Sequence, residues 1–294
     1  MAEGALLLNA LIWGGTFVIV KSALTDSSPM MFVAVRFTIA TLILLPFAYK
    51  SFSGVNKRSL IDGFNLGILL FLGFVFQTVG LKYTTATKSA FITGTFVVFI
   101  PIFQTIIEKR FPSRANIAGI LFVILGIIFL SSKGESVFDI FYEIGASFNF
   151  GDFLTLLCAV FYALYIVYLD IISHRNEFKY LTFSQIAVTA VLGYVASFTF
   201  SALELESIQF HLTDNLLLAL AYTSILATVI TLLLQTKYQK EVTPTRAGLI
   251  FSLEPIFAAV FAYIILTEML SYLGIIGCIF IFTGVLISEL LTKD

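Results

Sequence analysis

The sequence places one acidic residue and one proline side by side in an apolar segment. The stretch AGLIFSLEPIFAAV at residues 247–260 is apolar on both sides of Glu254 and Pro255. An ionised carboxylate in such surroundings is costly unless it is paired, and a proline leaves the carbonyl four residues back, that of Phe251, without its helix partner. Both are tolerated where they face protein or a wet cavity. One interpretation is that Glu254 binds a substrate amine, or binds and releases a proton. The other is that it accepts hydrogen bonds from hydroxyls of a neighbouring helix, or is simply protonated.

Arg36 is the other charge that lies deep in an apolar segment. If these segments are membrane-spanning helices, Glu254 lies about 10 Å from one face and Arg36 about 10 Å from the opposite face. A direct ion pair between them would need the arginine side chain to reach inward. We favour the alternative, in which Arg36 extends toward the membrane surface or caps helix ends.

Two segments that are far apart in the sequence carry the same pattern of aromatic and polar residues. One face has Asn9, Trp13 and Thr16, and the other has Cys158, Tyr162 and Tyr165 at the equivalent positions. Aromatic rings with a few hydrogen-bonding groups could hold an amphipathic organic ligand and stabilise a cation. The alternative is a stripe of packing residues, since 15% of the chain is aromatic.

Three further polar residues lie in apolar segments, namely Gln77, Thr228 and Thr231. Such groups bind a ligand or join neighbouring helices by hydrogen bonds. We favour helix joining for all three, and we keep Gln77 as a candidate contact for a ligand.

The composition is that of a membrane protein. The 294 residues are 59% hydrophobic and 12% charged, with a mean hydropathy of +1.00, whereas soluble domains are about 45–50% apolar and about 25% charged. A net charge of −1 gives no reason to expect nucleic acid as a partner. Cys158 and Cys278 lie in apolar runs without metal-ligand spacing, so we expect no metal and no cofactor.

Ten apolar runs are long enough to cross a bilayer as helices, which need roughly 20 residues each. The first run lacks the basic stretch of a signal peptide, so we expect it to be a retained span. The runs predict an all-α integral membrane protein. They lie at about 5–23, 29–49, 62–81, 89–107, 115–132, 152–172, 179–202, 214–235, 247–266 and 271–289.

The basic residues predict the orientation of these spans. Of the 17 Lys and Arg residues, twelve fall in connections on one side, four on the other, and Arg36 lies within a span. Because cytoplasmic loops are rich in Lys and Arg, both termini are expected in the cytoplasm of a cell whose inner membrane holds the protein. The acidic connection at 133–151 then lies outside.

That connection divides the chain into two halves of five spans each, residues 1–132 and 152–294. Asn9 matches Cys158 and Arg36 matches Gln185 at one constant spacing, and Pro101 matches Pro255 further on. Five is an odd number, so the second half enters the membrane in the opposite direction. We therefore expect an inverted repeat, which is common among secondary transporters.

Several segments carry a resemblance to a known family. They are WGGTFVIVKSAL (13–24), SPMMFVAVRFTIA (28–40), GLKYTTATKSAFI (80–92), FSLEPIFAAVFAYIILTE (251–268) and GIIGCIFIFTGVLI (274–287). With these segments the chain resembles the EamA-type members of the drug/metabolite transporter superfamily. The resemblance implies ten transmembrane helices in two inverted five-helix repeats around a central cavity, lined by spans 1, 3, 4, 6, 8 and 9. Tyr162 departs from the tryptophan expected in the second repeat.

The resemblance implies a secondary transporter, and more specifically an exporter of small organic metabolites such as amino acids or amines. Alternating access is the expected mechanism. Glu254 could couple transport to protons, and an uncoupled facilitator is the alternative. Its partners are then a small-molecule substrate and the lipid bilayer, and a homodimer stays open. The expected substrate-binding residues are Asn9, Trp13, Thr16, Gln77, Tyr162, Tyr165 and Glu254.

Two other classes fit the sequence less well. An intramembrane enzyme needs an active site, yet both histidines, His174 and His211, fall in connections, and there is no HExxH motif or nucleophile elbow. A channel would show rings of like charge or a carbonyl filter. No GxxxxGK[ST] motif is present, so ATP binding of that kind is not expected.

Overall fold

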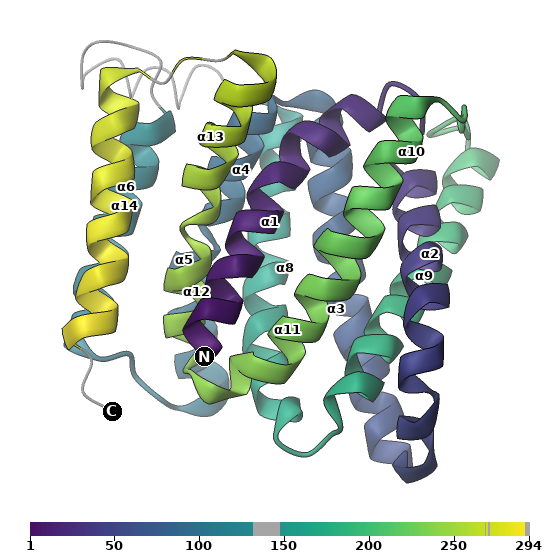
Figure 1. Cartoon of the computed structure of the whole chain (residues 1–294), viewed down its shortest axis with the longest axis horizontal. Coiled ribbons are helices and arrows are strands. Elements are labelled where there is room, and N and C mark those ends of the chain that lie inside the picture. The colour runs from purple at the N-terminus through teal and green to yellow at the C-terminus, as the bar shows by residue number, and fades with distance from the viewer. Residues whose placement is uncertain (132–147, 268, 270, 292–294) are drawn as a thin grey trace.

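The computed structural model describes residues 1–131, 148–267, 269 and 271–291. The described residues are almost entirely helical and form no strand, apart from an isolated bridge between Ser27 and Phe210. Most of the connection expected to be external, residues 133–151, lies outside the described residues. The helices form one bundle of long, roughly aligned segments (Figure 1).

The helix boundaries follow the apolar runs closely. Within the described ranges, nine helices or runs of consecutive helical segments are long and apolar enough to cross a membrane, and the helix from Arg114 to Leu130 is shorter. The prediction of an all-α membrane protein with ten spans is therefore confirmed. The helices are α1 (Ala2–Ala23), α2 (Pro29–Ala48), α3 (Lys57–Tyr83), α4 (Ala86–Gly94), α5 (Phe96–Glu108), α6 (Arg114–Ser131), α8 (Phe150–Ser173), α9 (Phe178–Ala202), α10 (Asp214–Ala221), α11 (Thr231–Tyr238), α12 (Pro244–Phe251), α13 (Glu254–Leu266) and α14 (Tyr272–Leu291), with short helical turns η1 (Tyr49–Gly54), η2 (Tyr222–Ile230) and η3 (Gln239–Glu241).

The fourth and ninth spans are each broken, although the sequence predicted one continuous run for each. The fourth is α4 followed by α5, and the ninth is α12 followed by α13. Pro255 lies in the first turn of α13, where the N–H that a proline lacks would have no helical partner in any case. The proline therefore lies at the beginning of a helix, whereas the sequence predicts it inside a continuous span, where it would leave the Phe251 carbonyl without a partner.

The eighth span contains a π-helical turn, η2, between α10 and α11. At its end the amide of Thr231 donates to the carbonyl of Leu226, five residues back, whereas a regular α-helix would pair it with Ala227. The hydroxyl of Thr228 donates to the carbonyl of Thr223, also five residues back, at 2.7 Å. This turn makes the Ala227 carbonyl accessible to side chains of other helices, and π-turns are frequent at functional sites.

Glycines let pairs of helices approach closely at the edge of the bundle, where α6 lies along α14 (Figure 1). A β-carbon built on Gly119 would lie 2.6 Å from the Gly284 carbonyl oxygen, and one on Gly126 would lie 2.7 Å from that of Gly277. These distances are too short for any side chain. The two glycine pairs therefore act in packing, as the sequence predicted.

The first helix begins, and the last helix ends, on the same side of the bundle (Figure 1). We call this the terminus side and the opposite one the far side. On the terminus side the ends of α3, α8 and α9 are joined by Asp62, whose carboxylate accepts hydrogen bonds from Arg175 at 2.6 and 2.8 Å and from Asn176 at 2.8 Å. On the far side the amide of Ser28 donates to the carbonyl of Gln209 at 2.9 Å and so links the first and second halves of the chain.

Candidate functional site

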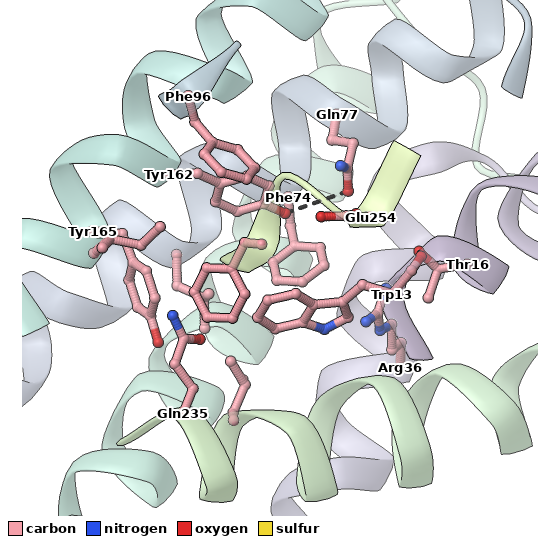
Figure 2. A pocket seen from close by; sticks show the side chains of 14 residues that line it. Trp13, Thr16, Arg36, Phe74, Gln77, Phe96, Tyr162, Tyr165, Gln235 and Glu254 are labelled. Atoms are coloured by element: carbon pink, nitrogen blue, oxygen red, sulfur yellow. Dashed lines mark hydrogen bonds between the residues drawn. The ribbon is translucent and has the colours of Figure 1, made fainter. Parts of the chain in front are cut away.

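A cavity lies at the centre of the bundle, where the broken ninth span faces α1, α3 and α8 (Figure 2). Its volume is about 50 Å³, which is room for a few water molecules. Most of its wall is aromatic or aliphatic. The side chains that line it are those of Trp13, Thr16, Arg36, Leu70, Phe74, Gln77, Phe96, Tyr162, Tyr165, Ile166, Leu232, Gln235, Phe251 and Glu254.

Glu254 lines this cavity as the first residue of α13. Its side chain is only 6% exposed, and among the described residues none forms a hydrogen bond or ion pair with its carboxylate. A helix N-terminus favours a nearby negative charge, so the break at residues 252–253 places the carboxylate where the backbone gives it some support. The site thus contains a buried carboxylate without a partner side chain.

Trp13 lines the cavity from α1 and is held in place by the eighth span. Its indole N–H donates to the Ala227 carbonyl at 3.2 Å and to the Thr231 hydroxyl at 3.1 Å, and its ring centroid lies 5.2 Å from that of Phe251. Gly14 allows α1 to lie against α13, because a β-carbon there would be 2.9 Å from the Ala258 amide nitrogen. This close approach holds Trp13 beside the break that carries Glu254.

Asn9 and Thr16 share a helix face with Trp13, yet only one of them reaches the cavity. Thr16 lines it, with its hydroxyl donating to the Trp13 carbonyl at 2.6 Å. Asn9 is fully buried outside the lining, and its amide donates to the Thr231 carbonyl at 2.9 Å. Asn9 therefore joins α1 to α11 in this conformation.

Tyr162, Tyr165 and Gln77 all line the cavity, from α8 and α3. The Tyr162 hydroxyl donates to the Gln77 side-chain carbonyl at 3.3 Å (Figure 2), and the Gln77 amide donates to Thr93 at 3.4 Å. The Tyr165 hydroxyl donates to Gln185 at 2.8 Å. The hydroxyls of both tyrosines thus form hydrogen bonds to neighbouring helices, while their rings form part of the cavity wall.

Arg36 is the main site residue that sequence reasoning missed, since we favoured a surface or capping role for it. It is 2% exposed and lines the same cavity as Glu254. Its guanidinium donates to the Thr228 hydroxyl at 2.9 Å and to the Ala227 carbonyl at 3.1 Å, and it lies 4.6 Å from the centroid of the Phe74 ring. The π-turn supplies both acceptors, the Thr228 hydroxyl and the Ala227 carbonyl. No sequence pattern predicted that turn.

Phe74, Phe251 and Gln235 also line the cavity, although no sequence pattern predicted a side chain of theirs in the site. The cavity receives residues from spans 1, 3, 4, 6, 8 and 9, which is the set implied by the resemblance, and from span 2 through Arg36. In the described part of the chain, none of the residues that line it belongs to α6, α9 or α14. Thr228 and Thr231 accept bonds from Arg36 and Trp13, so both join helices, as we had favoured.

A bundle of membrane-spanning helices around a central chamber with aromatic walls and buried charges is the architecture of a membrane transporter. Such chambers near the middle of a bundle, bordered by broken helices, are where transporters bind their solutes.

Comparisons with known proteins agree with this class. A family model described as the EamA-like transporter family matches residues 1–132 and 149–290. An uncharacterized transporter of Archaeoglobus fulgidus is 36% identical over 98% of this chain and 86% of its own. The uncharacterized transporter YyaM of Bacillus subtilis is 24% identical over 96% of this chain and 91% of its own. A crystal structure that covers 100% of both chains superposes with a TM-score of 0.77 at 18% identity, which shows a shared fold.

The chain therefore belongs to the EamA-like transporter family, and it is a multi-pass membrane transporter.

Proposed function

We propose that this transporter is a secondary carrier that moves small organic metabolites, such as amino acids or amines, by alternating access through the central cavity. The observation that carries the proposal is the Glu254 carboxylate, which is buried in that cavity without a partner among the described residues. A buried charge is costly unless it is paired, and ionisable groups inside membrane proteins mark substrate and ion pathways. A cationic group of a solute, or a proton, would supply the missing partner.

The size of the cavity supports a carrier that changes shape. A volume of about 50 Å³ admits a few water molecules but no organic metabolite. The walls must therefore move before a solute can bind. The breaks between α4 and α5 and between α12 and α13 are the places where the backbone is best able to bend.

Recurring helix ends support the proposal that residues 1–132 and 152–294 are inverted repeats. Thr85 caps the start of α4 and Thr243 caps the start of α12, in each case by accepting a bond from the amide three residues on. Lys109 and Thr267, which end the same two spans, both have left-handed backbone angles, with φ of 57° and 56°. Both pairs are separated by 158 residues. At this spacing Pro255 corresponds to Val97, so the earlier pairing of Pro101 with Pro255 does not follow the helix ends.

The distribution of Lys and Arg supports an orientation with both termini in the cytoplasm. Export from the cell, coupling to protons and a homodimer remain predictions.

Flux into proteoliposomes tests the proposal. Purified protein should accelerate uptake of a labelled amino acid or amine, the rate should saturate, and unlabelled solute inside the vesicles should raise it. Flux that rises linearly with concentration and ignores the solute on the other side would instead indicate a channel. A pH gradient across the same vesicles distinguishes a proton-coupled carrier, whose rate it changes, from an uncoupled facilitator.

A further inference from the structure

The central cavity contains two opposite charges that do not pair with each other. Arg36 and Glu254 both line it (Figure 2), yet no ion pair within 4.0 Å joins them in the described part of the chain. Both side chains are more than nine-tenths buried. A buried charge pair normally forms direct hydrogen bonds, because separated buried charges are costly.

Arg36 keeps donors available even after its protein contacts are made. A guanidinium has five N–H groups. The hydrogen bonds to Thr228 and Ala227 use one on Nε and one on Nη2, and they hold the plane of the group in one orientation. The remaining N–H groups are of the type that binds a carboxylate in a forked, two-bond arrangement.

We propose that the transport site selects solutes that carry both a carboxylate and an ammonium group, with Arg36 binding the carboxylate and Glu254 the ammonium. This inference rests on the proposed function and narrows it, because a simple amine would leave Arg36 without a counter-charge. A simple carboxylic acid would leave Glu254 unpaired in the same way. The aromatic wall of Trp13, Phe74 and Tyr162 then accommodates the rest of the solute.

The test compares three matched mixtures of isotope-labelled solutes in proteoliposomes. One contains the amino acids, the second the amines formed by removing their carboxylates, and the third the acids formed by removing their ammonium groups. At least one amino acid should move at least about ten times faster than its amine and its acid, because a hydrogen bond to a charged group is worth that much or more. Arg36→Gln should reduce amino-acid flux to the level of the matched amine, and Arg36→Lys should restore part of it.

Two results would overturn this inference and leave the carrier in place: amines or acids moving as fast as the amino acids, or unchanged amino-acid flux in Arg36→Gln. Vesicles that pass none of the three mixtures faster than protein-free vesicles would contradict the inference and the proposed function together. Thermal unfolding and gel filtration of each variant confirm that it is folded. Thr228→Val, which removes one anchor of Arg36 but keeps its charge, should lower the flux less than Arg36→Gln.

A second, independent observation concerns two ion pairs at opposite ends of the bundle. On the far side, Lys88 Nζ lies 2.5 Å from Asp152 Oδ2 and joins α4 to α8. On the terminus side, Arg246 Nη2 lies 3.4 Å from Glu3 Oε1 and joins α12 to α1. Each pair therefore connects the first helix of one half of the chain to the start of the broken span in the other half.

The two ion pairs occupy equivalent positions in the two halves. Lys88 and Arg246 are both the third residue after a capping threonine, and each amide donates to that threonine hydroxyl. Glu3 and Asp152 are separated by the same number of residues as Asn9 and Cys158. A twofold relation between the halves would therefore exchange one ion pair with the other.

The far-side ion pair is the tighter of the two. Asp152 is fully buried and also accepts a hydrogen bond from Thr84 at 2.6 Å, whereas the Glu3 side chain is 44% exposed. Arg246 is held mainly by Glu289, at 2.6 and 2.9 Å. We infer that the two pairs are matched gates, each closing the cavity on its own side, and that the far-side gate is the more firmly closed here.

Side-specific labelling tests the gates, given that the protein alternates between two open states. The reporter is Thr16→Cys, or Gln235→Cys as a second reporter, with Cys158 and Cys278 replaced by alanine. Lys88→Gln should raise labelling by a membrane-impermeant maleimide from the far side by about twofold to fivefold. Glu3→Gln should raise it from the terminus side. The inference would be overturned if either variant raised labelling equally from both sides, or mainly from the side opposite to its own ion pair. It would also be overturned if neither variant changed labelling at either reporter.

Discussion

Glu254 and Trp13 both line the cavity, and they are supported in different ways. Glu254 lies at the N-terminus of a half-helix without a partner side chain, while the Trp13 indole N–H is satisfied by Ala227 and Thr231. The tryptophan therefore contributes its ring to a solute, and Glu254 contributes a charge. Residues of these two kinds respond differently to substitution.

Replacing an aromatic wall residue should weaken solute binding more than it weakens the fold. We expect Trp13→Ala and Tyr162→Ala each to raise the apparent Kd of a transported solute about tenfold, because each removes a large contact surface from the cavity. The apparent Kd is obtained from the melting temperature measured at increasing solute concentrations. Phe47→Ala is the matched control, since Phe47 is an aromatic residue that is 65% exposed on α2. If a variant loses thermal stability but keeps its affinity for the solute, that residue packs the helices and does not bind the solute.

The sequence predicts a site residue where a pattern recurs in both halves of the chain. It does not predict one whose position depends on hydrogen bonds to another span. Trp13 and Tyr162 could be predicted because equivalent segments in the two halves repeat them. Arg36 could not, since its place in the cavity depends on the Ala227 carbonyl and the Thr228 hydroxyl at the π-turn of another span. Asn9 follows the same helical spacing as Trp13, but its amide pairs with α11.

At the scale of elements, apolar runs predicted where spans begin and end but not where they break. Hydrophobicity is continuous through residues 247–266, so it gives no sign of the two-residue break before Glu254. Pro255 is the one local signal, but inside a continuous apolar run it predicts a lost hydrogen bond and not the start of a new helix. The break in the fourth span, at Thr95, has no proline beside it, because Pro101 lies inside α5.

The pair formed by α6 and α14 should depend on its glycines. Gly284→Ala places a β-carbon 2.5 Å from the Gly119 carbonyl oxygen, a backbone atom that cannot move aside alone. We expect the two helices to separate locally and the melting temperature in detergent to fall by several degrees, for a loss of about 1–3 kcal/mol.

The control is Gly4→Ala, because a β-carbon at Gly4 meets no atom within 4 Å and alanine is the better helix former. That variant should melt at or slightly above the wild-type temperature. An unchanged melting temperature for Gly284→Ala would show that the helices are not held at this distance.

At the scale of the whole molecule, the charge distribution predicts how the bundle is placed in the membrane. Ser53, in η1, and Ser207, between α9 and α10, are both exposed and belong to opposite sides. In whole cells, Ser207→Cys should react with an impermeant maleimide, while Ser53→Cys should react only after the membrane is permeabilised. These experiments use a background in which Cys158 and Cys278 are alanine. The reverse pattern would contradict the cytoplasmic placement of both termini.

The central claim is that the cavity around Glu254 is the transport site of a carrier. The most direct test is the pH dependence of solute exchange by Glu254→Gln in proteoliposomes, with the solute found to move fastest in the wild type. Glutamine keeps the shape of the side chain but cannot ionise, so the account predicts that exchange is lost or no longer depends on pH while the protein remains folded. Exchange at the wild-type rate with the wild-type pH profile would contradict it and leave Glu254 a structural residue.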